Sequence, residues 1–417
     1  MTTEEQRPST SILIIILGAI TAFDAMAIDL YLPGFQEIGH ALAASPAAMQ
    51  STLAVFVGGA AIGQFIYGPL ADRIGRRMPL ALGIVLFVTA SVLAALSRNI
   101  ETLIVARGLQ GLGAAAGLVI PRAIIVDRYR GREIAKLFSA LLQVMMIAPV
   151  IAPPVGGVLV AALGWKVVFW ALALFGLASL GALYAFVPET LKSTHRATTG
   201  LRAAFTDYAG LFKRGRLSWM TLSSAFSMAG LFAYIGSSSF IFVDHFGLSP
   251  LVYSFVLAGN AIGMVVVAQV NVLLLKRWSE RQILVLGLAL HGACCVALLV
   301  ATLEFGAGFH VIGALIFLAM SSLSLTIGNG FALVMQSAPM RLAGSVSSLL
   351  GVAQYAFAGM AGALLALVYD ATLTPFIVTL LGCAIASLAT LAAAMQVPAE
   401  PAPSIEGRDQ DTSGASL

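Results

Sequence analysis

The chain has 417 residues, of which 59% are hydrophobic and only 10% are Asp, Glu, Lys or Arg. An ordinary soluble domain carries roughly 25% charged residues, so 23 basic and 19 acidic side chains are too few to cover a soluble protein of this length. The same composition excludes disordered, fibrous and disulfide-rich secreted proteins. We therefore expect an all-α integral membrane protein.

Apolar stretches long enough to span a bilayer recur along the whole chain. A hydrocarbon core of ~30 Å needs about 20 apolar residues per helix. Twelve such stretches cover residues 11–32, 47–69, 78–97, 101–124, 135–160, 166–187, 217–241, 250–274, 282–303, 309–334, 344–369 and 374–397. The first is too long for a signal peptide and holds two Asp. The sequence predicts twelve transmembrane helices and no soluble domain.

Lys and Arg are distributed unevenly between alternate loops. If the N-terminus is cytoplasmic, 20 of the 23 fall in cytoplasmic segments, Arg98 and Lys166 fall outside, and Arg107 lies within a helix. Cytoplasmic loops carry the excess of Lys and Arg, so we expect a multi-pass protein of a bacterial inner membrane with both termini cytoplasmic. The net charge of +4 then faces anionic lipid, and we expect no nucleic-acid partner.

The two halves of the chain resemble each other. Residues 59–63, Gly-Ala-Ala-Ile-Gly, recur 200 positions later as Gly-Asn-Ala-Ile-Gly. Two sets of six helices are typical of transporters built from pseudo-symmetric bundles. The predicted parts are an N-terminal six-helix bundle (1–190), a cytoplasmic linker (191–216), a C-terminal six-helix bundle (217–397) and a disordered cytoplasmic tail (398–417).

Short motifs in the first half carry a family resemblance. Residues 68–77 read Gly-Pro-Leu-Ala-Asp-Arg-Ile-Gly-Arg-Arg, 107–113 read Arg-Gly-Leu-Gln-Gly-Leu-Gly, and 148–157 read Ala-Pro-Val-Ile-Ala-Pro-Pro-Val-Gly-Gly. Together they resemble the signature motifs of the major facilitator superfamily. With Asp-Leu-Tyr-Leu-Pro at 29–33 and Pro-Glu-Thr-Leu at 188–191, the chain resembles the bicyclomycin/chloramphenicol-resistance (Bcr/CflA) group of drug:proton antiporters.

Three ionisable residues lie inside the predicted spans: Asp24 and Asp29 in the first helix and Arg107 in the fourth. A charge at mid-membrane costs at least ~2.5–3.5 kcal/mol, so it marks a functional site by default. All three fall at similar depth, which allows an Asp–Arg pair if the two helices meet. The two Asp are about 140° apart around the helix, so we expect one to face a central cavity and exchange protons while the other is paired or hydrated.

The choice between the two acids stays open. The resemblance favours Asp29 as the proton-coupling residue, whereas Asp24 lies nearer mid-membrane; Asp29 can alternatively reach interfacial water. For Arg107 the resemblance implies a role in proton transfer or charge balance, and the alternative is a side chain that extends to the outer interface. Gln110 can join the same network or make a helix–helix hydrogen bond.

The loop after the second helix is the predicted conformational latch, by resemblance to a family charge network that holds the outward-facing state. We expect the helix to end at Gly68 and Pro69. The proposed members are Gly68, Asp72, Gly75, Arg76 and Asp127. The alternative is that the loop only anchors the protein through its positive charges.

The fifth predicted helix is rich in proline and glycine. The resemblance makes it an antiporter hinge, with Ala152-Pro153 where the family usually shows Gly-Pro, and the alternative is a simple kink. The hinge residues are Pro149, Pro153, Pro154, Gly156 and Gly157.

Uncharged polar, aromatic and Met side chains in the spans are the candidates for a polyspecific substrate pocket. They are Tyr31, Gln64, Gln110, Gln143, Met146, Tyr234, Asn260, Asn329, Gln354 and Tyr355. Each can instead serve helix packing. We interpret Arg122 as an interfacial residue near the inner end of its helix.

Together, these features predict a secondary transporter that exports small amphipathic drugs or antibiotics in exchange for protons by alternating access. No ATP-binding motif is present, so the proton gradient is the expected energy source, with no cofactor or metal. We expect a monomer and no enzymatic activity. The alternative is a proton-coupled or facilitative transporter of an endogenous metabolite such as an amino acid.

Overall fold

The computed structural model describes residues 10–129, 132–191, 210, 215–337, 343–368, 370 and 372–397. Within these residues the chain forms helices and no strands, as predicted. The helices are α1 (Thr10–Thr21), α2 (Phe23–Asp29), the 3₁₀ turn η1 (Leu32–Gly34), α3 (Phe35–Ala41), α4 (Pro46–Ile74), α5 (Arg77–Ala95), α6 (Ile100–Arg128), α7 (Arg132–Leu163), α8 (Lys166–Phe186), α10 (Gly215–Ser239), the π-helix η3 (Phe240–His245), α11 (Pro250–Leu274), α12 (Glu280–Leu303), α13 (Phe309–Gln336), α14 (Ala343–Leu367) and α15 (Thr374–Gln396). The predicted tail (398–417) and most of the predicted linker (191–216) lie outside the described residues.

Among the described residues, eleven helices are long and apolar enough to cross a membrane. The segments Thr10–Thr21 and Phe23–Ala41, bent by 44°, make a twelfth if they count as one span. The prediction that α4 ends at Gly68 and Pro69 is wrong, because the helix continues to Ile74. An interior proline removes one backbone hydrogen bond and crowds the preceding turn, which can kink a helix without ending it. The helix ends at Gly75, whose φ of 105° favours glycine.

Equivalent helices of the two halves begin in the same way. The Ser45 hydroxyl accepts a hydrogen bond from the Ala48 N–H at 3.2 Å, and Pro46 is the first residue of α4. At the start of α11, Ser249 caps the Val252 N–H at 3.3 Å before Pro250. Such caps satisfy N–H groups that the first helical turn leaves without partners.

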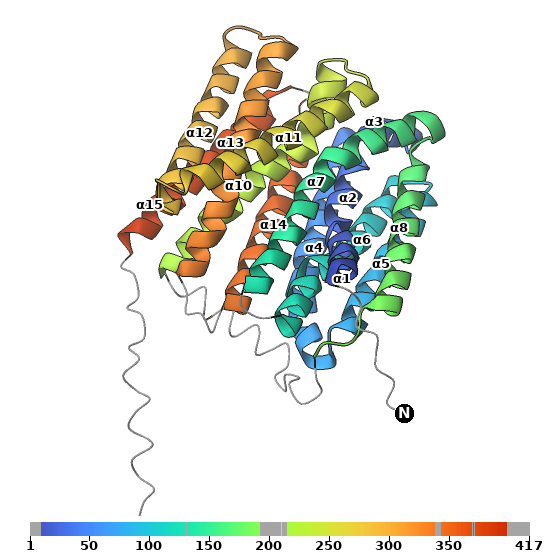
Figure 1. Ribbon diagram of the computed structural model, residues 1–417. Helices are drawn as coiled ribbons and strands as arrows, with labels where there is room; N and C mark the ends of the chain where they lie inside the picture. Colours follow the sequence, from blue (N-terminus) through green and yellow to red (C-terminus); the bar gives the residue numbers. More distant parts are fainter. Residues whose placement is uncertain are drawn as a thin grey trace, which may run out of the picture.

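The helices form two bundles that stand side by side, α1–α8 in one and α10–α15 in the other (Figure 1). One glycine of the repeat, Gly63 or Gly263, allows equivalent close packing in each bundle, whereas a Cβ would overlap α6 at Gly59 and meet open space at Gly259. A Cβ on Gly63 would overlap α6 at Leu112 and Ala115, and a Cβ on Gly263 would overlap α13 at Phe317. The pentapeptide repeat therefore has a shared packing role as well as a shared sequence.

The two ends of the molecule differ in chemistry. Figure 1 shows the first described residue and the end of α15 at the same end, where the α4–α5 loop with Arg76 also lies. We call this the basic end. At the opposite end, formed by α3, η3 and the starts of α4 and α15, the two halves touch. The ring of Phe35 meets Phe240 edge-on at 5.5 Å, and Gln36 Nε2 donates to Asp244 Oδ2 at 2.8 Å.

Candidate functional site

Arg107 of α6 is fully buried inside the first half. Its Nη1 donates to the Ala27 carbonyl at 3.0 Å and to Gln110 Oε1 at 2.5 Å. The guanidinium also lies over the rings of Phe56 and Tyr31, with centroid distances of 4.3 and 4.6 Å. A cation in this setting is stabilised by carbonyl dipoles and by aromatic quadrupoles. The alternative that Arg107 extends to the outer interface is therefore wrong.

The predicted Asp–Arg pair is also absent from the described residues, where Arg107 makes no ion pair with a carboxylate. Gln110 has both of its predicted roles. It joins the Arg107 network by accepting from Arg107, and it makes a helix–helix hydrogen bond by donating to Ser91 of α5 at 2.7 Å. Two guanidinium nitrogens, Nε and Nη2, have no hydrogen-bond partner among the described residues. Arg107 thus holds α2, α5 and α6 together around a buried positive charge.

Asp24 of α2 faces the second half of the protein. Its Oδ2 accepts a hydrogen bond from the Tyr355 hydroxyl of α14 at 2.6 Å, and its Oδ1 is buried without a hydrogen-bond partner in the part of the chain that the structure describes. The side chain of Asp24 is 7% exposed. Tyr355 is itself buried and packs against Phe232 of α10, with a centroid distance of 5.7 Å. A buried carboxylate from one half is therefore bonded to a phenol from the other.

Asp29 lies at the end of α2 and is partly exposed. Within the described part of the chain it makes neither a hydrogen bond nor an ion pair, but it interacts electrostatically with Asp24, Tyr234 and Tyr253. The two acids therefore face the second half at different places, Asp24 at α14 and Asp29 near α10 and α11. The partial exposure of Asp29 is what its interfacial alternative requires.

Several of the predicted pocket residues lie at or near the boundary between the halves. Tyr355 bonds Asp24, and Gln64 of α4 lies beside Gly351 of α14. Tyr234, near Asp29, accepts a hydrogen bond from Asn260. On α7, Gln143 is exposed and Met146 is half-buried.

Other predicted pocket residues bond within one half. Tyr31 is buried and shares a hydrogen bond with Thr52 at 2.7 Å. Asn329 joins α13 to α11 by donating to Asn271 at 2.8 Å, and Gln354 of α14 donates to Ser224 of α10 at 2.9 Å. Tyr31, Asn329 and Gln110 therefore contribute to the packing of helices within one half. Arg122 of α6 is partly exposed and interacts electrostatically with Tyr355. Its interfacial position stays a prediction.

The acidic and basic side chains of the predicted latch do come together at the basic end. Arg76 Nε donates to Asp127 Oδ2 at 2.8 Å, and its Nη1 donates to Asp72 Oδ1 at 2.5 Å. Burial alone would lower the pKa of Arg76, but these hydrogen bonds raise it. Gly75 supplies the positive φ that turns the chain toward α5.

Sequence reasoning missed Glu189 as a member of this network. Its carboxylate accepts the backbone N–H groups of Arg76 at 2.9 Å and Arg77 at 3.0 Å, at the start of α5. Partial burial alone would raise the pKa of Glu189, but these bonds and those from Leu191 and Thr190 hold it below its ordinary value. Thr190 also donates to Asp127 at 3.1 Å. An acid in the Pro-Glu-Thr-Leu motif, near a helix start with free N–H groups, was the available signal.

The proline-rich helix α7 is continuous from Arg132 to Leu163, through all three prolines. Its glycines mark close contacts instead. A Cβ on Gly156 would overlap the backbone of Leu30, and a Cβ on Gly157 would press on Ser254 of α11 in the other half. Small residues thus let α7 approach both the first span and the second bundle.

Comparison with known protein families identifies the family to which this fold belongs. Residues 16–363 match the model of the Major Facilitator Superfamily. This chain belongs to that superfamily. It is therefore a multi-pass membrane transporter of small molecules and not an enzyme.

Individual similar proteins identify the group within the superfamily to which the chain belongs. The chain is 33% identical over 343 residues, covering 81% of this chain and 84% of that protein, to the uncharacterised MFS-type transporter YdgK of Bacillus subtilis. It is 27% identical over 384 residues to a bicyclomycin resistance protein homolog of Haemophilus influenzae, covering 92% and 96% of the two chains. The predicted membership of the Bcr/CflA group is confirmed. The structure of a D-xylose-proton symporter aligns with a TM-score of 0.73 at 16% identity, covering 93% of this chain and 98% of that one, which shows the same fold.

Proposed function

We propose that this superfamily member exports small amphipathic drugs in exchange for protons across a bacterial inner membrane, with its basic end in the cytoplasm. The excess of Lys and Arg at the basic end supports this orientation. The drug-resistance relatives support the substrate class. The observation that carries the coupling is the hydrogen bond between buried Asp24 and Tyr355 of the other half.

The coupling follows from the position of this bond. A carboxylate binds its proton with an affinity set by its solvation, nearby charges and hydrogen bonds. When the halves separate around Asp24, the carboxylate loses the Tyr355 hydroxyl and meets water. The proton affinity of Asp24 then differs between the arrangement with the halves together and the arrangement with the halves apart. Such a difference is required for a proton gradient to favour one arrangement over the other. Asp24 is accordingly the proposed proton carrier, and Asp29 the second acid of the site.

Arg107 has a different part in this scheme. Because it bonds the Ala27 carbonyl of α2, three residues from Asp24, it fixes the helix that carries the acid. Its charge also favours an ionised carboxylate nearby without forming a direct pair. The predicted latch at the basic end would hold α4, α5 and α6 as one body while the halves rock.

Inside-out vesicles from a host without its own drug pumps test the proposal. A proton gradient should drive uptake of drugs from a panel that includes bicyclomycin, and drug addition should release protons. Asp24→Asn should abolish both signals, whereas Glu101→Gln, an exposed acid at the start of α6, should keep them. Full activity in both Asp24→Asn and Asp29→Asn would refute proton coupling through these acids. Movement of drug and protons in the same direction would instead favour metabolite symport.

A further inference from the structure

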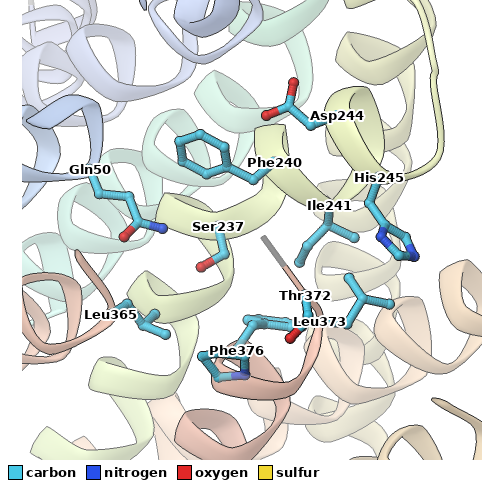
Figure 2. Close-up of a pocket in the computed structure, with 11 residues that line it drawn as sticks. Gln50, Ser237, Phe240, Ile241, Asp244, His245, Leu365, Thr372, Leu373 and Phe376 are labelled. Atoms are coloured by element: carbon cyan, nitrogen blue, oxygen red, sulfur yellow. The ribbon is translucent and has the colours of Figure 1, made fainter. Parts of the chain in front are cut away.

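A cavity of about 250 Å³ lies at the opposite end, away from Asp24. It is lined by Gln50, Ser237, Phe240, Ile241, Asp244, His245, Leu365, Thr372, Leu373, Pro375 and Phe376. None of the predicted pocket residues is among them. Figure 2 shows Gln50 entering from one side, with Ser237, Leu365 and Phe376 around the space and Asp244 at its edge. Gln50 comes from the first half, and every other lining residue comes from the second.

The local backbone is built to form this cavity. Phe240–His245 is a π-helix, and the Phe246 N–H bonds the Ile241 carbonyl five residues back, at 3.2 Å. Phe240, Ile241, Asp244 and His245 of this segment all line the cavity. π-Helical turns are rare, and they occur frequently at functional sites.

Gln50 supplies an independent sign that a ligand is expected. Gln50 is 4% exposed, yet its Oε1 is buried without a hydrogen-bond partner among the residues that the structure describes. Buried polar groups nearly always have partners, so this amide oxygen is a position where a bonding partner is expected.

The charge of the lining selects the ligand class. Asp244 carries the negative charge, and Gln36 occupies only its Oδ2. The titratable groups near it are His245 and His40. None of the eleven lining residues in the described structure is Lys or Arg. The remaining walls are apolar, with Phe240, Phe376 and Leu373 among them.

We propose that this cavity is a binding site for a small organic cation, with its ammonium group at Asp244 and Gln50 and its apolar part between Phe240 and Phe376. Drug-sized ligands occupy pockets of roughly 300–1,000 Å³, so the ligand is smaller than a typical drug. Because Gln50 belongs to the other half, the site is complete only while the two halves are together at this end. A bound cation therefore favours this arrangement. The proposal does not depend on drug export.

Titration of the purified full-length protein with benzylamine, which is a cation at neutral pH, tests the site. An uncharged detergent avoids binding to charged lipid, and benzyl alcohol is the neutral ligand of matched shape. We expect benzylammonium to bind at least about tenfold more tightly than benzyl alcohol, the effect of one charge-assisted hydrogen bond. Equal affinity for the two ligands would overturn the proposal.

Two variants locate the binding. Asp244→Asn should remove the preference for the cation, and Gln50→Leu should weaken cation binding without lowering the Tm, because it replaces an unpaired buried amide with a side chain of similar size. Glu101→Gln, at the same end but outside the cavity, should bind as the parent does. Unchanged binding in both cavity variants would overturn the proposal.

Asp24→Asn separates this site from the proposed transport site. It should keep benzylammonium binding even where it abolishes proton-driven export. Loss of binding in Asp24→Asn together with retention in Asp244→Asn would place the cation at Asp24 and overturn the cavity assignment. Failure of drug export in every vesicle assay would leave the expected binding pattern unchanged, so the two proposals fail independently.

Discussion

Tyr355→Phe tests the contact that joins the two halves at Asp24. The change removes one hydroxyl and keeps the ring that packs against Phe232. The lost bond is a 2.6 Å hydrogen bond to a carboxylate whose other oxygen has no partner within the described structure. Hydrogen bonds to charged groups contribute about 1.5–3 kcal/mol, which corresponds to roughly 10- to 100-fold in the balance between the two arrangements. We therefore expect proton-driven export to fall at least about tenfold.

The matched control is Tyr253→Phe. Tyr253 is also fully buried, but its hydroxyl bonds Ser238 within the second half, at 2.7 Å. Removing this bond should lower stability slightly and change export by less than the Tyr355 variant does. Drug counterflow, which needs no net proton movement, provides the second readout. There, Tyr355→Phe should have little further effect in an Asp24→Leu background, because its partner is already gone. Wild-type export by Tyr355→Phe, or additive effects of the two changes, would refute the reasoning.

Three further predictions concern the supports of the site. Arg107→Lys should reduce export at least about tenfold while the protein still folds. One ammonium group cannot reproduce a planar guanidinium that is bonded to two acceptors and stacked on two rings. Full export in vesicles would contradict this prediction. Gly111→Ala should destabilise the protein by about 1–3 kcal/mol in thermal melts, since its Cβ would overlap the Phe56 carbonyl, whereas Gly292→Ala, with open space around it, should be neutral or stabilising. Because hydrogen bonds hold the pKa of Glu189 below its ordinary 4.5, its contribution to stability is fully present above that pH and is lost as the pH falls through the lowered value. Glu189→Gln should therefore lower the Tm at pH 7 and less so near pH 3, and equal losses at both pH values would show that the charge is unimportant.

The fold could be predicted from the sequence because the features that indicate membrane helices are local in the chain. Apolar length alone identifies each membrane span, and caps such as Ser45 and Ser249 mark helix starts. The end of α4 was harder. Pro69 is a strong breaker in isolated helices, but here the helix continues past it to Gly75. One missing hydrogen bond is a small loss in a helix of 29 residues.

The site was only partly predictable, because sequence position gives depth and not rotation or partner. Depth correctly placed Asp24, Asp29 and Arg107 in one region. It could not show that Arg107 would turn toward Ala27 and two aromatic rings instead of a carboxylate. Nor could it show that Asp24 would meet Tyr355, since these residues are 331 positions apart. Both outcomes depend on how the bundles pack.

The placement of polar contacts suggests how the halves move. In the described part of the chain, the ion pairs of the basic end, Arg76 with Asp72 and Asp127, join helices of the same half. Among the described residues, the hydrogen bonds that cross between the halves include those of Tyr355 with Asp24 and of Gln36 with Asp244 and Ser239. Separation at the basic end leaves the ion pairs intact, whereas separation at the opposite end breaks the Gln36 bonds. The proposed protonation of Asp24 would act between these two ends, at the bond whose strength depends on the charge of the carboxylate.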